Sequence, residues 1–340
     1  MRQDGVAEFI SASPYSPIYY STGFSIGKED SNISINFPQK DRFHILTTNW
    51  SSCICQVLQV IFFYDIVMDK KVREYHVNIE TKYIAEDRRL IECSSDMNVT
   101  IDFLHISEGR NIMDVHITRR ENNYGLTNMP EEYLQLMDQV NDIQAHLTLS
   151  IDRYGRIKSV LKYDDLYDKW QDIKSRINPN SNGMAKIMHD GDEVYGMGAA
   201  HFAKQLNKAT LYKALGMGLF SFEKATGNRE CWGWRTTSIL IPTMGIDLNI
   251  IRDEMVHDPY APTTLQVFKN KTAESNAHKM EAKFLSLFPF LKKQMGKYRV
   301  QFMCTVTKDA SHGWPVSIEW AMSEYVSPVS ADVVCKIELV

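Results

Sequence analysis

The chain has 340 residues, of which 44% are hydrophobic and 24% are charged, which is the composition of an ordinary soluble globular protein. These proportions exclude the disordered, collagen-like and fibrous classes. Lys and Arg number 38 against 42 Asp and Glu, and the formal net charge of −4 gives no field that would attract a polyanion. We therefore expect no nucleic-acid partner.

The N-terminus, Met1–Glu8, carries acidic residues where a signal peptide needs a basic start and an unbroken apolar stretch. The most apolar segment, Val57–Val67, is interrupted by Gln59 and Asp65, whereas a membrane-spanning helix needs about 20 apolar residues. We expect a cytoplasmic protein with no membrane span. The cysteines are scattered, which favours reduced, buried thiols over a disulfide framework. They are Cys53, Cys55, Cys93, Cys231, Cys304 and Cys335.

The first 120 residues alternate apolar and polar side chains in several short stretches, which is the period of a half-buried antiparallel strand. Residues 24–37 predict a hairpin around a polar turn at 27–32. Residues 53–68 are dense in Val, Ile, Phe and Tyr; we interpret them as a strand, although their length also permits a helix. The remaining alternating stretches are 75–79, 99–103 and 115–117.

Helix signals begin at Pro130, which is followed by acids and by apolar residues three and four positions apart as far as Leu147. Residues 148–160 predict a hairpin around an Asp-to-Gly turn. Asp164 and Asp165 are expected to cap a second helix, whose apolar stripe ends at Ile177.

Asn178–Gly183 is a cluster of turn-forming residues and predicts a loop or an internal boundary. A third helix is predicted from Met197 to Lys224, and a fourth over 280–295 with a kink at Pro289. Three alternating stretches at the C-terminal end predict strands. These are 300–306, 316–322 and 333–339.

The predicted class is α+β, with mostly antiparallel β-sheet in the N- and C-terminal parts and a helical middle. Residues 1–178 form a β-rich half that ends in a strand–turn–strand–helix unit, and residues 183–340 form a helical segment followed by antiparallel strands. The two halves are either separate or one compact unit. The turns at 152–155 and 309–313 are similar enough to suggest a duplication, although turn chemistry alone produces such matches.

This order of elements resembles that of lipid-carrier folds, in which a curved antiparallel sheet wraps around helices. The resemblance is one of architecture and rests on no motif. It implies a carrier of an apolar ligand as one alternative function.

The densest polar cluster contains His189, Asp192, Glu193 and His201, which are residue types that bind metals. Their spacing matches no known metal motif, and carboxylates placed ahead of a helix complement its positive N-terminus without any metal. We therefore predict no metal and no cofactor, and keep these four residues as weak metal candidates.

Two further patterns fall short of a catalytic or phosphate-binding motif. Gly196 and Gly198 lack the third glycine of a dinucleotide loop, so we interpret them, with Gly216 and Gly218, as glycines that permit close helix packing. Cys231 precedes β-forming residues, so no helix N-terminus would activate its thiol.

Aromatic residues in β-rich or turn segments are the candidate binding residues. Tyr and Trp contribute much of the energy at protein interfaces, although core packing explains most of them equally well. Trp314 follows His312 in a predicted turn, and we expect it at a surface. The predicted binding residues are Trp314, His312, Trp232 and Trp234.

The leading hypothesis is a non-catalytic protein that binds another macromolecule, or a second copy of itself, as a component or inhibitor of a larger assembly. The second hypothesis is a carrier that encloses an apolar small molecule between sheet and helices. The third is a hydrolase that uses the 189–201 cluster or Cys231.

Overall fold

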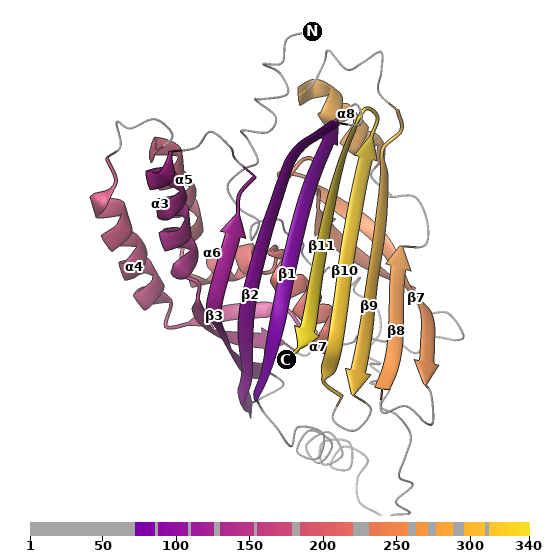
Figure 1. Ribbon diagram of the computed structural model, residues 1–340, viewed down its shortest axis with the longest axis horizontal. Helices are drawn as coiled ribbons and strands as arrows, with labels where there is room; N and C mark the ends of the chain where they lie inside the picture. Colours follow the sequence, from indigo (N-terminus) through magenta and orange to yellow (C-terminus); the bar gives the residue numbers. More distant parts are fainter. Residues whose placement is uncertain are drawn as a thin grey trace, which may run out of the picture.

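A computed structural model gives the arrangement of most of the chain after residue 71 (Figure 1). The structure describes residues 72–85, 88–107, 110–125, 130–152, 155–178, 184–219, 231–257, 263–270, 277–287, 296–309 and 313–340. The hairpin predicted over 24–37, the strand predicted over 53–68 and the kink at Pro289 lie outside these residues.

Eleven described strands form one antiparallel sheet, in the order β5-β4-β3-β2-β1-β11-β10-β9-β8-β7-β6. The strands are β1 Val72–Ala85, β2 Arg88–Ser107, β3 Arg110–Asn123, β4 His146–Asp152, β5 Ile157–Leu161, β6 Cys231–Thr237, β7 Gly245–His257, β8 Thr263–Asn270, β9 Arg299–Asp309, β10 Pro315–Val326 and β11 Val329–Leu339.

Six described helices accompany the sheet, five of them between β3 and β6 in the chain. They are α3 Glu131–Asp142, α4 Tyr163–Arg176, α5 Met184–Tyr195, α6 Ala199–Leu206, α7 Thr210–Leu219 and α8 Ala277–Leu287. The predicted α+β class, with antiparallel strands towards both ends and helices in the middle, is confirmed.

The centre of the sheet joins strands from the two ends of the described chain. Val77 on β1 lies opposite Ile337 on β11, and Ile79 lies opposite Cys335. All four side chains are buried, whereas their neighbours in sequence are partly or fully exposed. Alternation of period two therefore gives both ends of the described chain one common apolar face. The division of the chain near 178–183 and the duplication both stay predictions.

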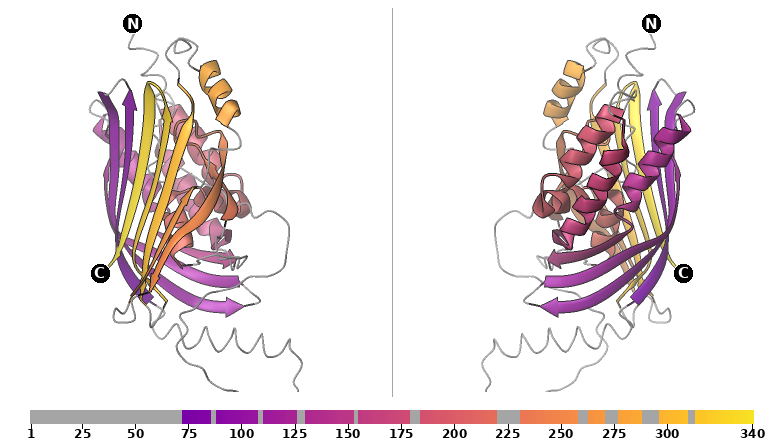
Figure 2. Two further views of the ribbon diagram at one scale, coloured as in Figure 1. Left: turned by 90° about the vertical axis from the view of Figure 1, so that its right-hand side faces the viewer. Right: turned by 90° about the vertical axis from the view of Figure 1, so that its left-hand side faces the viewer.

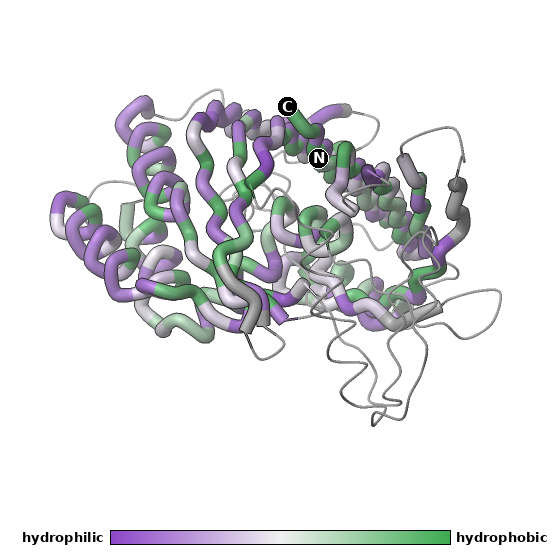
Figure 3. The backbone as a smooth tube through the Cα atoms, turned by 90° about the horizontal axis from the view of Figure 1, so that it is seen from below, coloured by the Kyte–Doolittle hydropathy of each residue, from purple (hydrophilic) through white to green (hydrophobic). Residues whose placement is uncertain are grey.

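The sheet is strongly curved, and the helices lie on its concave side (Figures 2 and 3). β4 and β5 turn away from the direction of the central strands and run beneath the helices in Figure 2. α7 packs against β9, β10 and β11, and nine of its ten residues are buried. Among the described residues, no helix combines the length and the apolar character needed to cross a membrane.

The prediction of one helix from Met197 to Lys224 is wrong, because α6 ends at Leu206 and α7 begins at Thr210. Between them the Asn207 side chain donates to the Ala203 carbonyl, 2.9 Å away, and bonds to the backbone of Ile157 on β5. Side-chain bonds of this kind compete with the backbone bonds that would continue a helix. Residues 220–224 lie outside the described part.

Two further expectations about the helices need correction. Asp164 and Asp165 do not cap α4, because the N-cap residue is Lys162 and the two acids lie in the first turn. The 189–193 cluster does not precede a helix, because it lies inside α5. The acids of α4 still lie where they complement the positive end of the helix.

Candidate apolar site between helix α7 and strands β3 to β5

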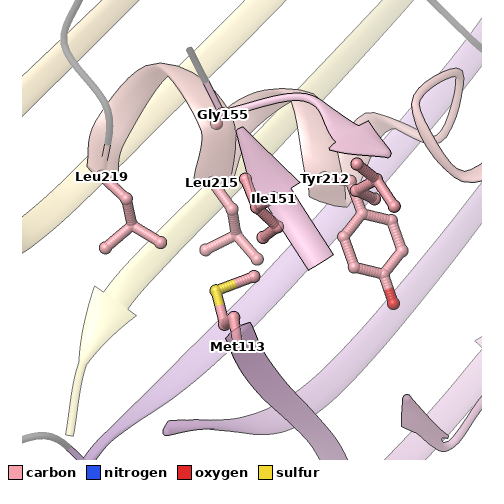
Figure 4. A pocket seen from close by; sticks show the side chains of 8 residues that line it. Met113, Ile151, Gly155, Tyr212, Leu215 and Leu219 are labelled. Carbon is pink, nitrogen blue, oxygen red and sulfur yellow. The ribbon is translucent and has the colours of Figure 1, made fainter. Parts of the chain in front are cut away.

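A hollow lies between α7 and the curved end of the sheet, where the β4–β5 hairpin approaches the helix. Its free space is about 10 Å³, room for one water molecule. Leu215 and Leu219 of α7 point towards Met113 of β3 and Ile151 of β4 (Figure 4). Apart from the Tyr212 hydroxyl, the side chains that line the hollow are apolar. They are Met113, Ile151, Ile157, Tyr212, Leu215 and Leu219.

The spacing of residues on α7 produces this wall. Residues 212, 215, 216 and 219 follow the three- and four-residue intervals that place side chains on one face of a helix. Gly216 belongs to this face and lies at the β4–β5 turn, where a Cβ would be 3.4 Å from the Gly155 carbonyl oxygen, an ordinary contact distance. Gly155 itself has a φ of 72°, which favours glycine at this turn.

A polar group lies at one end of this wall. Tyr212 is 6% exposed, and its hydroxyl has no hydrogen-bond partner within the described residues. Burial raises the pKa of the phenol, and the positive charge of Arg120 on β3 acts against that rise. Arg120 donates from Nη1 to the Asn141 carbonyl at the end of α3, 2.9 Å away. Its Nε is buried without a partner among the described residues.

The opposite face of α7 rests on the sheet through a buried lysine. Lys213 is 3% exposed, and its Nζ lies 5.2 Å from the centre of the Trp320 ring, a cation–π contact. Burial lowers the pKa of Lys213 well below its usual value. Trp320 lies opposite Cys304 on one side and Cys335 on the other, so both thiols flank this contact.

Glu324 on β10 is a second buried ionisable group, and it holds the β6–β7 loop against the sheet. Its carboxylate accepts hydrogen bonds from the Ser238 hydroxyl at 2.6 Å, the Tyr298 hydroxyl at 3.1 Å and the backbone N–H of Ile239. Burial raises the pKa of this carboxyl to about 7, although the hydrogen bonds act in the opposite direction. All of these partners belong to the fold, so the cluster serves as a structural anchor.

The expectation that Trp314 lies at a surface is wrong. Trp314 is 2% exposed and packs edge-on against Phe103 of β2, with ring centres 5.3 Å apart. Trp234 is 1% exposed, and its ring centre lies 4.6 Å from that of Phe302. These contacts agree with core packing. His312 and the side chain of Trp232 lie outside the described residues.

The four weak metal candidates are distributed over two helices. On α5, His189 and Glu193 are exposed, and Asp192 accepts hydrogen bonds from Trp170 Nε1 at 3.0 Å and from Lys174 Nζ at 2.6 Å. On α6, the His201 Nε2 lies 2.8 Å from Gln205. In the part of the chain that the structure describes, no three His, Cys, Asp or Glu side chains are grouped to hold a metal ion.

The interpretation of the glycines is correct in part. A Cβ at Gly218 would meet the Ile318 side chain at 2.1 Å, so this glycine does permit close packing. Gly198 has open space around it, and its φ of 89° is the reason for glycine there. Cys231 begins β6, in agreement with the prediction that no helix follows it directly.

Sequence reasoning offered an apolar ligand between sheet and helices as one alternative, but it did not locate the hollow. Tyr212, Leu215 and Leu219 were visible only as part of an apolar helix, and Arg120 gave no signal in its local sequence. The face shared by residues 212, 215, 216 and 219 was readable. The residues that lie opposite that face are determined by the curvature of the sheet, which no local sequence pattern predicts.

No protein-family model and no curated protein matches this chain. Three solved structures are similar to it over most of its length, all at low identity. A lipovitellin, described for its lipid–protein interactions, is 9% identical with a TM-score of 0.39, over 79% of this chain and 25% of that one. This chain therefore spans about a quarter of the lipovitellin.

The other two structures are less similar. A DUF1329 family protein from Desulfovibrio piger is 5% identical with a TM-score of 0.16, over 84% of this chain and 92% of that one. MucB, in complex with MucA(peri), is 7% identical with a TM-score of 0.10, over 78% and 89% respectively. At these TM-scores the three likenesses support no conclusion about ligand or activity.

Proposed function

We propose that this protein carries an apolar ligand, part of which lies in the hollow between α7 and strands β3 to β5. The observation that supports the proposal is the lining of the hollow, where five aliphatic or thioether side chains gather, four of them buried and Leu219 half-buried. Moving an apolar group from water into such a lining stabilises it by about 0.8 kcal/mol per CH₂.

The size of the hollow restricts what it can hold. Its free space is about 10 Å³, room for one water molecule, which lies far below the roughly 300–1,000 Å³ typical of pockets for drug-sized ligands. A ligand therefore enters only if α7 and the β4–β5 hairpin move apart, and a flexible apolar chain needs a smaller movement than a rigid ring system.

The binding of another macromolecule, the leading hypothesis from the sequence, stays a prediction. Two of its four candidate residues, Trp314 and Trp234, are buried and offer little area to a partner. The cytoplasmic location and the non-catalytic character also stay predictions.

The proposal is tested by narrowing the hollow. Leu219 is half-buried at its rim, and Leu219→Trp would place an indole there. Leu161→Trp is the matched control, because Leu161 is exposed on β5 and does not line the hollow. Affinity is measured by displacement of a neutral apolar fluorophore by a 16-carbon alcohol.

We expect the unchanged protein and Leu161→Trp to bind the alcohol equally, and Leu219→Trp to bind it at least about 10-fold more weakly, since a filled site loses several buried CH₂ contacts. The proposal is rejected if the unchanged protein does not bind the alcohol, or if Leu219→Trp binds it as well as the control.

A further inference from the structure

The Tyr212 hydroxyl is a hydrogen-bond donor that an apolar ligand alone would leave without a partner. The Tyr212 hydroxyl is buried with no acceptor within the described residues, yet its ring forms part of the wall. Buried hydroxyls are nearly always hydrogen-bonded, because an unpaired one loses its bond to water and gains nothing in return. A ligand with an acceptor atom at this end would satisfy it.

The charge beside this hydroxyl is positive. Arg120 points to the concave side of the sheet, since it lies opposite the buried Met97 on β2. It forms no ion pair with any described carboxylate, and one of its donors, Nε, has no partner there. The other charged or titratable groups near it are Asp142, which is exposed at the end of α3, and the phenols of Tyr124 and Tyr195.

Those two phenols are already engaged within the fold. The Tyr195 hydroxyl donates to the Val140 carbonyl at 3.1 Å and accepts from Gln144 at 2.8 Å. The Tyr124 hydroxyl donates to Asp138 at 2.6 Å. Within the described residues, the Tyr212 hydroxyl and the Nε of Arg120 are therefore the donors of this group that lack a partner; Arg120 acts on Tyr212 through its charge but does not line the hollow.

We infer that the ligand is a long-chain carboxylate, with its apolar chain along Leu215 and Leu219 and its carboxylate oxygens facing the Tyr212 hydroxyl and the Arg120 guanidinium. This inference rests on the proposed function and adds the class of ligand to it. A guanidinium and a phenol provide a counter-charge and a directed hydrogen bond, and charge-assisted bonds of this kind are stronger than neutral ones.

The test compares a 16-carbon carboxylate with the 16-carbon alcohol at pH 8, in the unchanged protein and in Tyr212→Phe. Tyr195→Phe is the matched control, because it removes a buried hydroxyl near the same arginine whose hydrogen bonds lie within the fold. Arg120→Gln removes the charge. Should that variant not fold, Tyr212→Phe alone decides the outcome.

We expect the unchanged protein to prefer the carboxylate by about 10-fold or more, which is the scale of one hydrogen bond to a charged group. Tyr212→Phe should weaken carboxylate binding about 10-fold and alcohol binding by less than about threefold, while Tyr195→Phe changes neither. The resonance of a ¹³C-labelled carboxyl group should also shift between the unchanged protein and Tyr212→Phe.

Equal binding of carboxylate and alcohol, or no effect of Tyr212→Phe, would overturn the inference and leave the proposed function standing. Binding of neither molecule to the unchanged protein would overturn both.

Discussion

The Asn207 side chain covers the backbone of Ile157 on the edge strand β5. Its carboxamide oxygen accepts from the Ile157 N–H at 2.9 Å, and its nitrogen donates to the Ile157 carbonyl at 2.7 Å. An edge strand otherwise leaves such groups open to pairing with another chain. The residue that ends α6 thus also protects one edge of the sheet.

Asn207→Ala should lower the free energy of unfolding by about 1–3 kcal/mol, because it leaves backbone groups of a half-covered strand without partners. Urea denaturation measures this change. Asn249→Ala, at an exposed position on β7, should stay within about 0.5 kcal/mol. Equal stability of the two variants would show that water replaces Asn207 without cost.

The buried carboxyl of Glu324 should make stability depend on pH. Burial raises its pKa to about 7 in the folded protein, from 4.5. Between these values the native state binds more protons than the unfolded state, so stability falls as the pH rises from about 4.5 to 7, by up to about 3 kcal/mol. Glu324→Gln should remove most of this fall.

Urea denaturation of both proteins at several pH values between 4.5 and 7 measures the difference. The lowered pKa of Lys213 makes stability rise with pH up to 10.5 in both proteins, and because the Glu324 charge acts on Lys213, the difference reports the titration of Glu324 together with this coupling. Parallel curves for the two proteins would mean that Glu324 does not change protonation in this range.

Gly191 in α5 should not tolerate a methyl group. A Cβ there would lie 2.2 Å from the ring of Trp170 on α4, whose indole is fully buried. Gly191→Ala should therefore cost about 1–3 kcal/mol through overpacking. Gly216→Ala, on α7 with 3.4 Å of space, is the control and should be neutral or slightly stabilising, because alanine favours a helix. A stabilised Gly191→Ala would show that Trp170 can move.

Three described cysteines should be unreactive in the folded protein. Burial raises the pKa of Cys93 to about 11 and that of Cys335 to about 12, and it raises the pKa of Cys304 further. Since the thiolate is the reactive form, iodoacetamide at pH 8 should label them only after unfolding.

Peptide mass spectrometry would locate the label. Ser286→Cys, at an exposed position on α8, provides a thiol that should react at once. If Cys335 in the folded protein reacted as fast as the thiol introduced by Ser286→Cys, this would contradict its burial. For these three cysteines, the prediction of reduced, buried thiols agrees with the structure.

The parts of the fold that were predictable are those with a local pattern. β9, β10 and β11 were identified because one face of each strand is buried, so period two is visible in the sequence. β7 was missed. Its alternation ends in charged residues, and its register with β8 shifts between Arg252 and Glu254.

Contacts between distant segments were not predictable. Trp314 follows a turn glycine and was expected at a surface, but its ring lies against Phe103, more than 200 residues earlier in the chain. The hollow has the same origin, because it forms where α7 meets a hairpin that the curved sheet brings beneath it. The spacing of residues within one segment does not predict a contact with a distant segment.

The central claim is that the hollow beside α7 holds the apolar part of a ligand. A 16-carbon carboxylate with a photoreactive diazirine near its chain end tests this directly, with the labelled peptides identified by mass spectrometry. We expect label on the segments that contain Leu215, Leu219 and Ile151, and its loss when unlabelled carboxylate is added in excess. Label spread over the convex face, or undiminished by competition, would contradict the account.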